Sequence, residues 1–382
     1  MTRDPPGSEI GANGATVALE EIRADPFGAR LGGKAFQGRM ASASEDTQSK
    51  DILYSSLDMR NIERSSEFVF NSRGDKLHVR SFWPSDKPKA VVIFLHGYSA
   101  HISRPHHLPI ANQLNENGYA YICLDFHGHG YSEGLRGYVQ DFTHLEDDVI
   151  SLLFHLYRKK DTDGQKVKYD ADVCYLHRRA YGCSFYLMGS SQGGSIALRL
   201  GNRLYNTPTF PFSAHFRGCI LLSPLIRTHT PSTFRRVLVD YTMVPLFPKS
   251  FMSSTRNRDP IRDLTFSNPD YLQYVKSDEY PENPEGLSYA GPLYYKTASE
   301  TLRMMLSMNS AIEQVSFPFI VLHDDKDEIS LVDGIKELMR KSRTSQNHKE
   351  YKQVNGGRHE VIANKMNDVL PGILEWLKSE SS

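Results

Sequence analysis

The sequence predicts an α/β protein whose sheet is mostly parallel and doubly wound, with helices on both faces. Five short, continuously apolar runs alternate with segments of helical spacing, as expected for strands that are buried on both faces. One long stretch, residues 227–298, interrupts this alternation and is rich in proline and aromatic residues. A stretch of that length inside a compact domain predicts an inserted cap or lid. In such a sheet the ligand cleft lies at the carboxyl ends of the strands.

The elements follow in chain order. Residues 1–60 of the 382 are rich in Gly, Ala, Ser and acidic residues, so we expect a disordered leader. The first part of the core, residues 61–226, begins with a β-hairpin at residues 67–83, and residues 299–382 form its second part. The apolar runs that predict buried strands are residues 90–95, 119–124, 185–188, 219–222 and 319–322. Helical spacing covers residues 105–117, 143–158, 192–205, 331–342 and 366–379, whereas residues 161–182 are polar and predict a surface excursion.

The composition argues against nucleic acid as a partner. Forty-five basic residues balance forty-five acidic ones, so no global field favours a polyanion, and small uncharged or amphipathic substrates fit better. No run approaches the roughly 18 to 20 apolar residues that a spanning helix needs. The N-terminus has neither a signal-peptide pattern nor the acid-poor composition of a transit peptide, which favours the cytosol. The cap is the candidate surface for peripheral contact with a membrane.

The four cysteines are too few for a disulfide scaffold. Two of them, Cys123 and Cys219, sit in apolar runs that predict buried strands, so reduced thiols are the simplest interpretation. Cys174 and Cys183 flank a polar stretch and would be able to pair if the chain were exported.

The most informative motif is Gly189-x-Ser191-x-Gly193, between an apolar run and a helix-like segment. This setting predicts a nucleophile elbow, in which a sharp turn holds one serine in a strained conformation and glycines let the chain pass closely. A serine hydroxyl is a weak nucleophile, so Ser191 needs a general base, and the base needs an acid that fixes its tautomer. With this elbow, the acid and then the histidine follow later in the chain.

Both partners are present in that order. Asp327 follows the apolar run 319–322 at a place where a short turn can aim its carboxylate at a histidine, with Asp325 as the reserve candidate. His359 follows the predicted strand at residues 351–354 and the pair Gly356 and Gly357, in a late loop. Taken alone, the Asp-rich turn would be interpreted as a solvated loop and His359 equally well as a surface histidine. Three partial signals, each at the end of a predicted strand, favour a catalytic triad.

The tetrahedral intermediate of acyl transfer needs two backbone N–H donors for its oxyanion. We expect them from Gln192, directly after the nucleophile, and from Tyr98, after the predicted turn at Gly97. The candidate substrate-binding residues are His96, Arg104, Tyr241 and Tyr295. For His96, a histidine that is hydrogen-bonded to the backbone of its loop is the favoured alternative.

No cofactor or metal is expected from the motifs. The sequence has neither a His-Glu-x-x-His nor a Cys-x-x-Cys pattern, and no phosphate- or dinucleotide-binding glycine motif. The histidines at positions 101, 106, 107, 127 and 129 are therefore not interpreted as metal ligands.

Several motifs together resemble one branch of the α/β-hydrolases. They are His96-Gly-Tyr-Ser-Ala-His101, Asp125-Phe-His-Gly-His-Gly130, the elbow from Gly189 to Gly194, and His323-Asp-Asp-Lys-Asp327. From about Glu67 onward, the chain resembles the monoacylglycerol lipase and lysophospholipase-like family of the serine aminopeptidase S33 type, including plant caffeoylshikimate esterase-like relatives. The resemblance implies an α/β-hydrolase fold with a cap after the sixth core strand. It also implies Ser191 as nucleophile, Asp327 as acid and His359 as base.

The chain departs from the pattern of this family at three places. Ser99 and Ala100 stand where many monoacylglycerol lipases have Gly and Glu, and Asp324 replaces the usual glycine of the acid loop. Ser190 and Gln192 occupy elbow positions that are often His and Met. Gln192 is expected to contribute only its backbone, so this last change should leave catalysis intact.

The leading functional hypothesis is a cofactor-free serine hydrolase that cleaves esters of lipid-like small molecules, such as monoacylglycerol or lysophospholipid. An aromatic cap over a neutral cleft would shelter an acyl chain, although the same aromatic residues could form only a hydrophobic subcore. The alternative enzyme is an esterase or acyltransferase for smaller or phenolic acyl groups. The alternative outside enzymes is a ligand-binding module without catalysis. The sequence carries no signal for an oligomeric state.

Overall fold

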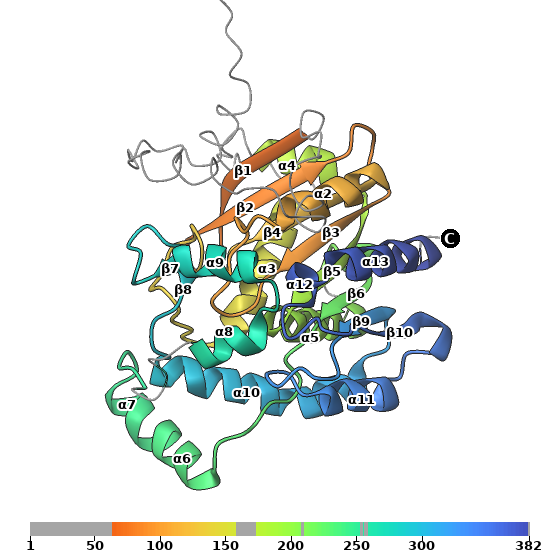
Figure 1. The fold of residues 1–382 in the computed structure, drawn as a ribbon. Coiled ribbons are helices and arrows are strands. Elements are labelled where there is room, and N and C mark those ends of the chain that lie inside the picture. Colours follow the sequence, from red (N-terminus) through yellow and green to blue (C-terminus); the bar gives the residue numbers. More distant parts are fainter. Residues whose placement is uncertain (1–62, 158–172, 208–209, 253–254, 256–258, 381–382) are drawn as a thin grey trace, which may run out of the picture. The chain divides into compact units, whose positions relative to one another are not determined.

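The computed structural model describes residues 63–157, 173–207, 210–252, 255 and 259–380. The predicted disordered leader, residues 1–60, lies outside the described residues. Figure 1 shows the described part as a central sheet with helices on both sides. The sequence-based prediction of a doubly wound α/β architecture is therefore confirmed.

The central sheet has eight strands among the described residues, in the order β1-β2-β4-β3-β5-β6-β9-β10. The hairpin partners β1 and β2 are antiparallel, as is the β2–β4 pair, and the remaining neighbours are parallel. The strands are β1 (Glu63–Phe70), β2 (Lys76–Trp83), β3 (Ala90–Leu95), β4 (Tyr119–Leu124), β5 (Ser184–Ser190), β6 (Phe216–Leu222), β9 (Phe319–His323) and β10 (Lys349–Gln353).

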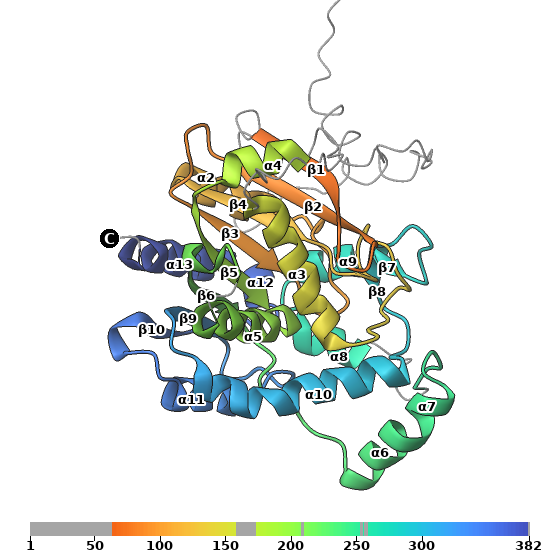
Figure 2. The ribbon, with the colours of Figure 1, turned by 180° about the vertical axis from the view of Figure 1, so that it is seen from behind.

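Continuous apolar runs form the centre of this sheet because both of its faces are covered. Every residue of β3, β4 and β9 is buried. Helices α2 (His107–Glu116) and α13 (Met366–Glu380) contact strands from one face (Figure 1). Helices α3 (Phe142–Tyr157) and α5 (Gln192–Asn206) lie on the other face (Figure 2). With α11 (Val332–Lys341), these helices confirm the five helical segments that the spacing predicts.

The polar stretch 161–182 is not only a surface excursion. Its described part contains helix α4 (Val173–Ala180), in which Leu176 and Ala180 are fully buried. Two apolar residues at helical spacing among several basic ones are too weak a signal to reveal a helix. Nearby Cys183 is a free thiol, like Cys123 and Cys219.

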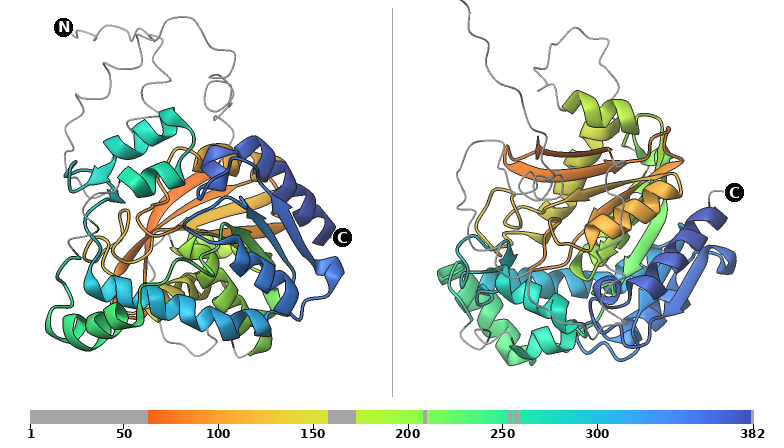
Figure 3. Two further views of the ribbon diagram at one scale, coloured as in Figure 1. Left: turned by 60° about the horizontal axis from the view of Figure 1, so that its bottom comes forward. Right: turned by 45° about the horizontal axis from the view of Figure 1, so that its top comes forward.

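The insertion lies between β6 and β9 and consists largely of helices (Figure 3). Helix α10 (Tyr295–Ala311) buries three methionines (Met304, Met305 and Met308) in the main hydrophobic core. It begins at Tyr295, so the predicted cap boundary at residue 298 falls inside this helix. The other described elements between β6 and β9 are α6 (Thr233–Leu238), the π-helix η3 (Val239–Met243), α7 (Val244–Leu246), α8 (Asp259–Thr265), α9 (Pro269–Ser277), β7 (Glu279–Tyr280), β8 (Ser288–Tyr289) and the 3₁₀ helix η5 (Ile312–Gln314). Among the described helices, none combines the length and apolar character needed to cross a membrane.

Candidate active site

The predicted elbow joins β5 to α5 at Ser191. Ser191 has φ 52° and ψ −118°, a region that non-glycine residues rarely occupy and that costs about 1–3 kcal/mol. The backbone around it compensates: Ser191 N–H donates to Leu222 O (2.9 Å), and Ser191 O accepts from Leu225 N–H (3.0 Å). The surrounding strands therefore hold the serine in its strained conformation, half-buried at the carboxyl end of the sheet.

The two flanking glycines are required by close backbone packing. A Cβ on Gly189 would lie 2.3 Å from Gly193 O, and one on Gly193 would lie 2.1 Å from Leu95 O. A larger residue at position 193 would push the elbow away from β3, and one at position 189 would collide with the backbone at the start of α5. The glycine spacing is thus explained by sterics at this turn.

Three residues distant in the sequence meet at this serine. The distance from Ser191 Oγ to His359 Nε2 is 2.7 Å, and the distance from His359 Nδ1 to Asp327 Oδ2 is also 2.7 Å. In the tautomer that this chain of contacts requires, Nδ1–H donates to Asp327 and Nε2 accepts from the Ser191 hydroxyl. His359 and Asp327 are buried, with exposures of 6% and 4%.

Electrostatics couples the histidine to the carboxylate. Burial opposes the charged form of both side chains, but their hydrogen bond and mutual attraction outweigh it. The pKa of His359 is therefore raised above its ordinary value, and the pKa of Asp327 is lowered. Asp327 Oδ1 also accepts from the N–H groups of Ile329 (2.8 Å) and Ser330 (3.0 Å). The carboxylate is thus ionised and fixed in orientation beside the imidazole.

The side chain of Asp325, the reserve candidate for the acid, contacts Tyr351 and not His359. This side chain is exposed, and its Oδ1 accepts a hydrogen bond from the Tyr351 hydroxyl on β10. Between the two acids that the sequence left open, the geometry selects Asp327 as the partner of His359.

A third aspartate of the same loop, Asp324, was noted in the sequence as a departure from the family pattern but was given no role. Asp324 is 3% exposed, and its carboxylate accepts from Lys326 N–H (3.0 Å) and from Arg358 N–H (2.8 Å). Arg358 directly precedes His359 in the chain. Asp324 therefore connects the loop of the acid to the loop of the histidine.

Removing the hydrogen bonds of Asp324 should let His359 and Asp327 shift relative to each other. We expect Asp324→Ala to lower kcat/KM by about 10- to 100-fold, because small displacements of reacting groups have effects of that size. Steady-state kinetics with a soluble ester, together with the melting temperature, measures this. Glu328→Ala, an exposed change in the same loop, is the control that should leave kcat/KM unchanged. Equal kinetics for both variants would contradict the role of Asp324.

The histidine loop is also attached to the insertion. Arg358, with φ 46°, donates through its guanidinium to the carbonyl oxygens of Asp263 and Phe266 (2.7 Å for Phe266). The backbone N–H groups of His359 and Glu360 donate to Leu264 O and Thr265 O at the end of α8 (3.4 and 3.2 Å). Part of the insertion thus positions the histidine, in addition to covering the sheet.

The loop after β3 passes directly over Ser191. A Cβ on Gly97 would lie 3.1 Å from Ser191 Cβ and 3.7 Å from its Oγ. The N–H of Gln192, the first residue of α5, has no partner within the helix because of helix geometry. Tyr98, whose hydroxyl donates to Gly137 O (2.9 Å), follows Gly97 in this loop. The two predicted oxyanion residues thus flank the same serine.

A buried carboxylate supports this loop. Asp125 is fully buried and accepts from the His78 ring (2.8 Å) and from the N–H groups of Ile102 (2.8 Å) and Tyr131 (3.1 Å). Burial alone would raise the pKa of Asp125, but the hydrogen bond and charge of His78 hold it well below its usual range. The ionised Asp125 therefore connects three parts of the chain: β2, the loop after β4 and the end of the loop after β3, which carries Tyr98.

His96 does not have a ring nitrogen available for a substrate. Phe126 N–H donates to His96 Nε2 (3.0 Å), so Nδ1 carries the proton and donates to Gly97 O (2.7 Å). Burial lowers the pKa of His96 to about 4, so it is neutral. These contacts agree with the favoured alternative, a histidine hydrogen-bonded to the backbone of its loop, and the selection of His96 as a substrate-binding residue stays a prediction.

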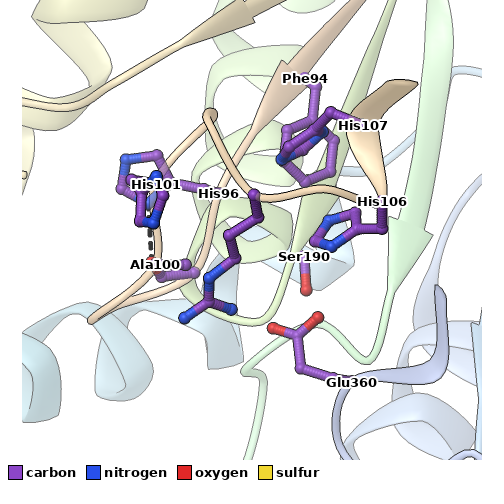
Figure 4. A pocket seen from close by; sticks show the side chains of 10 residues that line it. Phe94, His96, Ala100, His101, His106, His107, Ser190 and Glu360 are labelled. Carbon is purple, nitrogen blue, oxygen red and sulfur yellow. Dashed lines mark hydrogen bonds between the residues drawn. The ribbon is translucent and has the colours of Figure 1, made fainter. Parts of the chain in front are cut away.

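Arg104 lines a small buried cavity beside the elbow. The cavity has about 10 Å³ of free volume, close to what one water molecule needs. Arg104 is 5% exposed, forms no ion pair among the described residues, and its Nε–H has no hydrogen-bond partner there. Glu360, which the sequence reasoning missed, lines the same cavity, and Figure 4 shows its carboxylate pointing toward the Ser190 hydroxyl.

The two predicted tyrosines lie elsewhere. Tyr241 is on η3 with 79% of its side chain exposed, and Tyr295 begins helix α10. Neither lines the cavity of Arg104. The structure thus separates these tyrosines from Arg104, although all were predicted to bind substrate.

The neighbouring histidines are engaged with protein groups. His101 contacts Asp278 (2.7 Å), and His106 and His107 contact the hydroxyls of Tyr271 (2.5 Å) and Tyr121 (2.9 Å). No group of three or more potential metal-ligating side chains is found in the described part of the chain.

Comparisons with known proteins show the family and the fold of this chain. The family described as serine aminopeptidase, S33, matches residues 86–366. The monoacylglycerol lipase of Mycolicibacterium smegmatis is 24% identical over 316 residues, 82% of this chain and 97% of the relative. The caffeoylshikimate esterase of Arabidopsis thaliana is 23% identical over 352 residues, 87% of this chain and 89% of the relative. A soluble variant of monoglyceride lipase from Saccharomyces cerevisiae has a similar fold, with a TM-score of 0.63 and 17% identity over 87% of this chain and 99% of that one.

Proposed function

Because the chain belongs to the serine aminopeptidase S33 family and has the α/β-hydrolase fold, we propose that it cleaves carboxylic esters of lipid-like substrates through a Ser-His-Asp triad. The observation that carries this proposal is the pair of 2.7 Å contacts linking Ser191 to His359 and His359 to Asp327. The strained elbow supports it, since backbone strain of this kind persists where function needs it.

The chemistry follows from the tautomer of His359. Ser191 Oγ attacks the ester carbonyl while its proton moves to His359 Nε2, and Asp327 stabilises the imidazolium. The imidazolium then gives this proton to the leaving alcohol as the ester C–O bond breaks, which leaves an acyl-serine. Water, deprotonated by His359, hydrolyses this intermediate and releases the acid. The N–H groups of Tyr98 and Gln192 donate to the oxyanion in both steps.

The relatives named as monoacylglycerol lipases favour a glycerol-type ester. The cavity beside the elbow supports this substrate class. It is lined by Arg104, whose Nε–H has no hydrogen-bond partner among the described residues, and by the acceptor Glu360, in a volume suited to about one water. A hydroxyl group both donates and accepts hydrogen bonds and has about the size of a water molecule. We therefore assign Arg104 and Glu360 to a free hydroxyl of the alcohol part.

A panel of esters tests the substrate class. We expect hydrolysis of long-chain monoacylglycerol, and kcat/KM that rises by up to about fourfold per methylene from acetyl to longer acyl esters, because each buried methylene contributes about 0.8 kcal/mol. A lysophospholipid and a caffeoyl ester complete the panel. The similarity to a caffeoylshikimate esterase motivates the second candidate, a phenolic acyl esterase. A maximum on the caffeoyl ester, with no gain from chain length, would favour that alternative.

The pH dependence of kcat/KM tests whether His359 is the general base. His359 must be neutral to accept the serine proton, so kcat/KM should fall as pH drops through its pKa. Because Asp327 raises that pKa, the acid limb should have its midpoint above the ordinary value of 6.5. Asp327→Asn, which removes the stabilising charge, should move the midpoint to lower pH. A midpoint below 6.5 in the unmodified protein would contradict the pairing.

A further inference from the structure

A second serine, outside the candidate active site, also contacts a histidine. Ser66 lies on β1 and is exposed, and the distance from its Oγ to His78 Nε2 on β2 is 2.9 Å. The distance from His78 Nδ1 to Asp125 Oδ2 is 2.8 Å. The same atoms, in the same order, join a nucleophile, its base and an orienting acid in a catalytic triad. These strands lie at one edge of the sheet (Figure 1), whereas Ser191 follows β5.

The hydrogen bonds of His78 determine its tautomer. The ionised Asp125 can only accept hydrogen bonds, so His78 Nδ1 carries a proton and donates to it. In the neutral imidazole, Nε2 is then the acceptor, and the Ser66 hydroxyl is its donor. The N–H groups of Ile102 (2.8 Å) and Tyr131 (3.1 Å) hold the carboxylate in place. A base that is oriented in this way can take the hydroxyl proton of Ser66.

Two aromatic rings flank this imidazole. Phe68 is paired with His78 across the two strands, and their ring centroids are 5.5 Å apart. The Tyr131 ring packs edge-on against His78 at 5.2 Å and is 39% exposed. Because aromatic rings pack favourably against one another, a compound with an aryl group fits beside this imidazole.

The surroundings of the Ser66 hydroxyl differ from those of Ser191. Ser66 lies inside a regular strand, whereas Ser191 is the N-cap of α5. The strand supplies no helix N-terminus that could stabilise an oxyanion. The loss of one oxyanion donor alone costs about 10²–10³ in rate, so acyl transfer to Ser66 should be slow and should need a good leaving group. Hydrolysis of an acyl-Ser66 would need the same stabilisation, so the acyl group should remain.

We propose that Ser66 is an acyl-acceptor site for activated aryl esters. The Ser66 hydroxyl attacks the ester carbonyl while its proton moves to His78 Nε2. The bond between the carbonyl carbon and the phenolic oxygen then breaks, His78 gives the proton to the leaving phenolate, and the acyl group stays on Ser66 as an ester. This inference does not rest on the proposed function, because no step uses Ser191, Asp327 or His359.

Acetylation by p-nitrophenyl acetate tests the proposal. The full chain carrying Ser191→Ala is treated with excess ester over hours, and its peptides are quantified by mass spectrometry. We expect one stable acetyl group on Ser66, formed at least about 100-fold faster than on the exposed Ser310, because a positioned base contributes at least that factor. The Ser310 hydroxyl donates to a backbone carbonyl oxygen instead (3.1 Å). His78→Gln, with circular dichroism as the check on folding, should slow the acetylation of Ser66 by at least about 100-fold.

Two controls locate the modification. Ser65→Ala changes the adjacent serine, whose Oγ contacts Glu67 and Ser81 (2.6 Å each), and it should keep the acetyl group on Ser66. Ser66→Ala should remove this acetyl group. With Ser191 intact, Ser66→Ala should leave hydrolysis of a soluble ester unchanged, which shows that the fold survives.

The outcomes separate this site from the proposed function. Acetylation of Ser66 at the rate of Ser310 would overturn the proposal, as would an unchanged rate in folded His78→Gln. A chain with Ser191 intact that acetylates Ser66 but hydrolyses no ester would support the second site and contradict the proposed function.

Discussion

Replacing Ser191 by alanine should abolish ester hydrolysis and covalent labelling by a fluorophosphonate, while the protein stays folded. The expected loss in kcat is about 10⁴- to 10⁶-fold, because a triad without its nucleophile retains only oxyanion and binding contributions. The change should also disturb the packing little, because alanine keeps the Cβ of Ser191, which lies close to Gly97. Labelling followed by mass spectrometry of the modified peptide, with the circular dichroism spectrum as the check on folding, measures this result.

The preceding serine provides a matched control. Ser190 is 3% exposed and lines the cavity beside the elbow, whereas Ser191 Oγ contacts His359. Ser190→Ala should therefore keep fluorophosphonate labelling. Labelling that survives in Ser191→Ala would place the nucleophile elsewhere. A folded parent protein that neither labels nor hydrolyses any ester would favour a ligand-binding module without catalysis.

Sequence patterns predicted the sheet well because its central strands are buried on both faces. In such strands the apolar residues are continuous, and the short runs 90–95 and 119–124 coincide with β3 and β4. The elbow was visible because close packing demands glycine at positions 189 and 193. Ser191, Asp327 and His359 could be proposed together because each follows a predicted strand, and parallel strands bring their carboxyl ends to one edge.

The remaining features depend on long-range contacts that no local pattern records. Asp324 and Asp325 are adjacent and chemically identical, yet one is buried against the loop of His359 and the other faces Tyr351. The attachment of Arg358 to the end of α8 joins segments far apart in the chain. The aromatic content of residues 227–298 predicted a cap, but composition alone does not say which of these side chains are exposed, as Phe234 and Tyr241 are.

The two neighbouring acids of the loop give the sharpest test of the triad. Asp327→Asn should lower kcat by about 10⁴-fold, because an amide that donates to His359 Nδ1 would favour the wrong tautomer and supply no charge. Asp325→Asn should change kcat little, because its carboxylate contacts Tyr351 at the exposed side of the loop. Kinetics of both variants with one soluble ester, at a pH above the pKa of His359, separates these effects. If Asp325→Asn lowered kcat more than Asp327→Asn did, Asp325 would be the acid of the triad. The loop would then have to rearrange before catalysis.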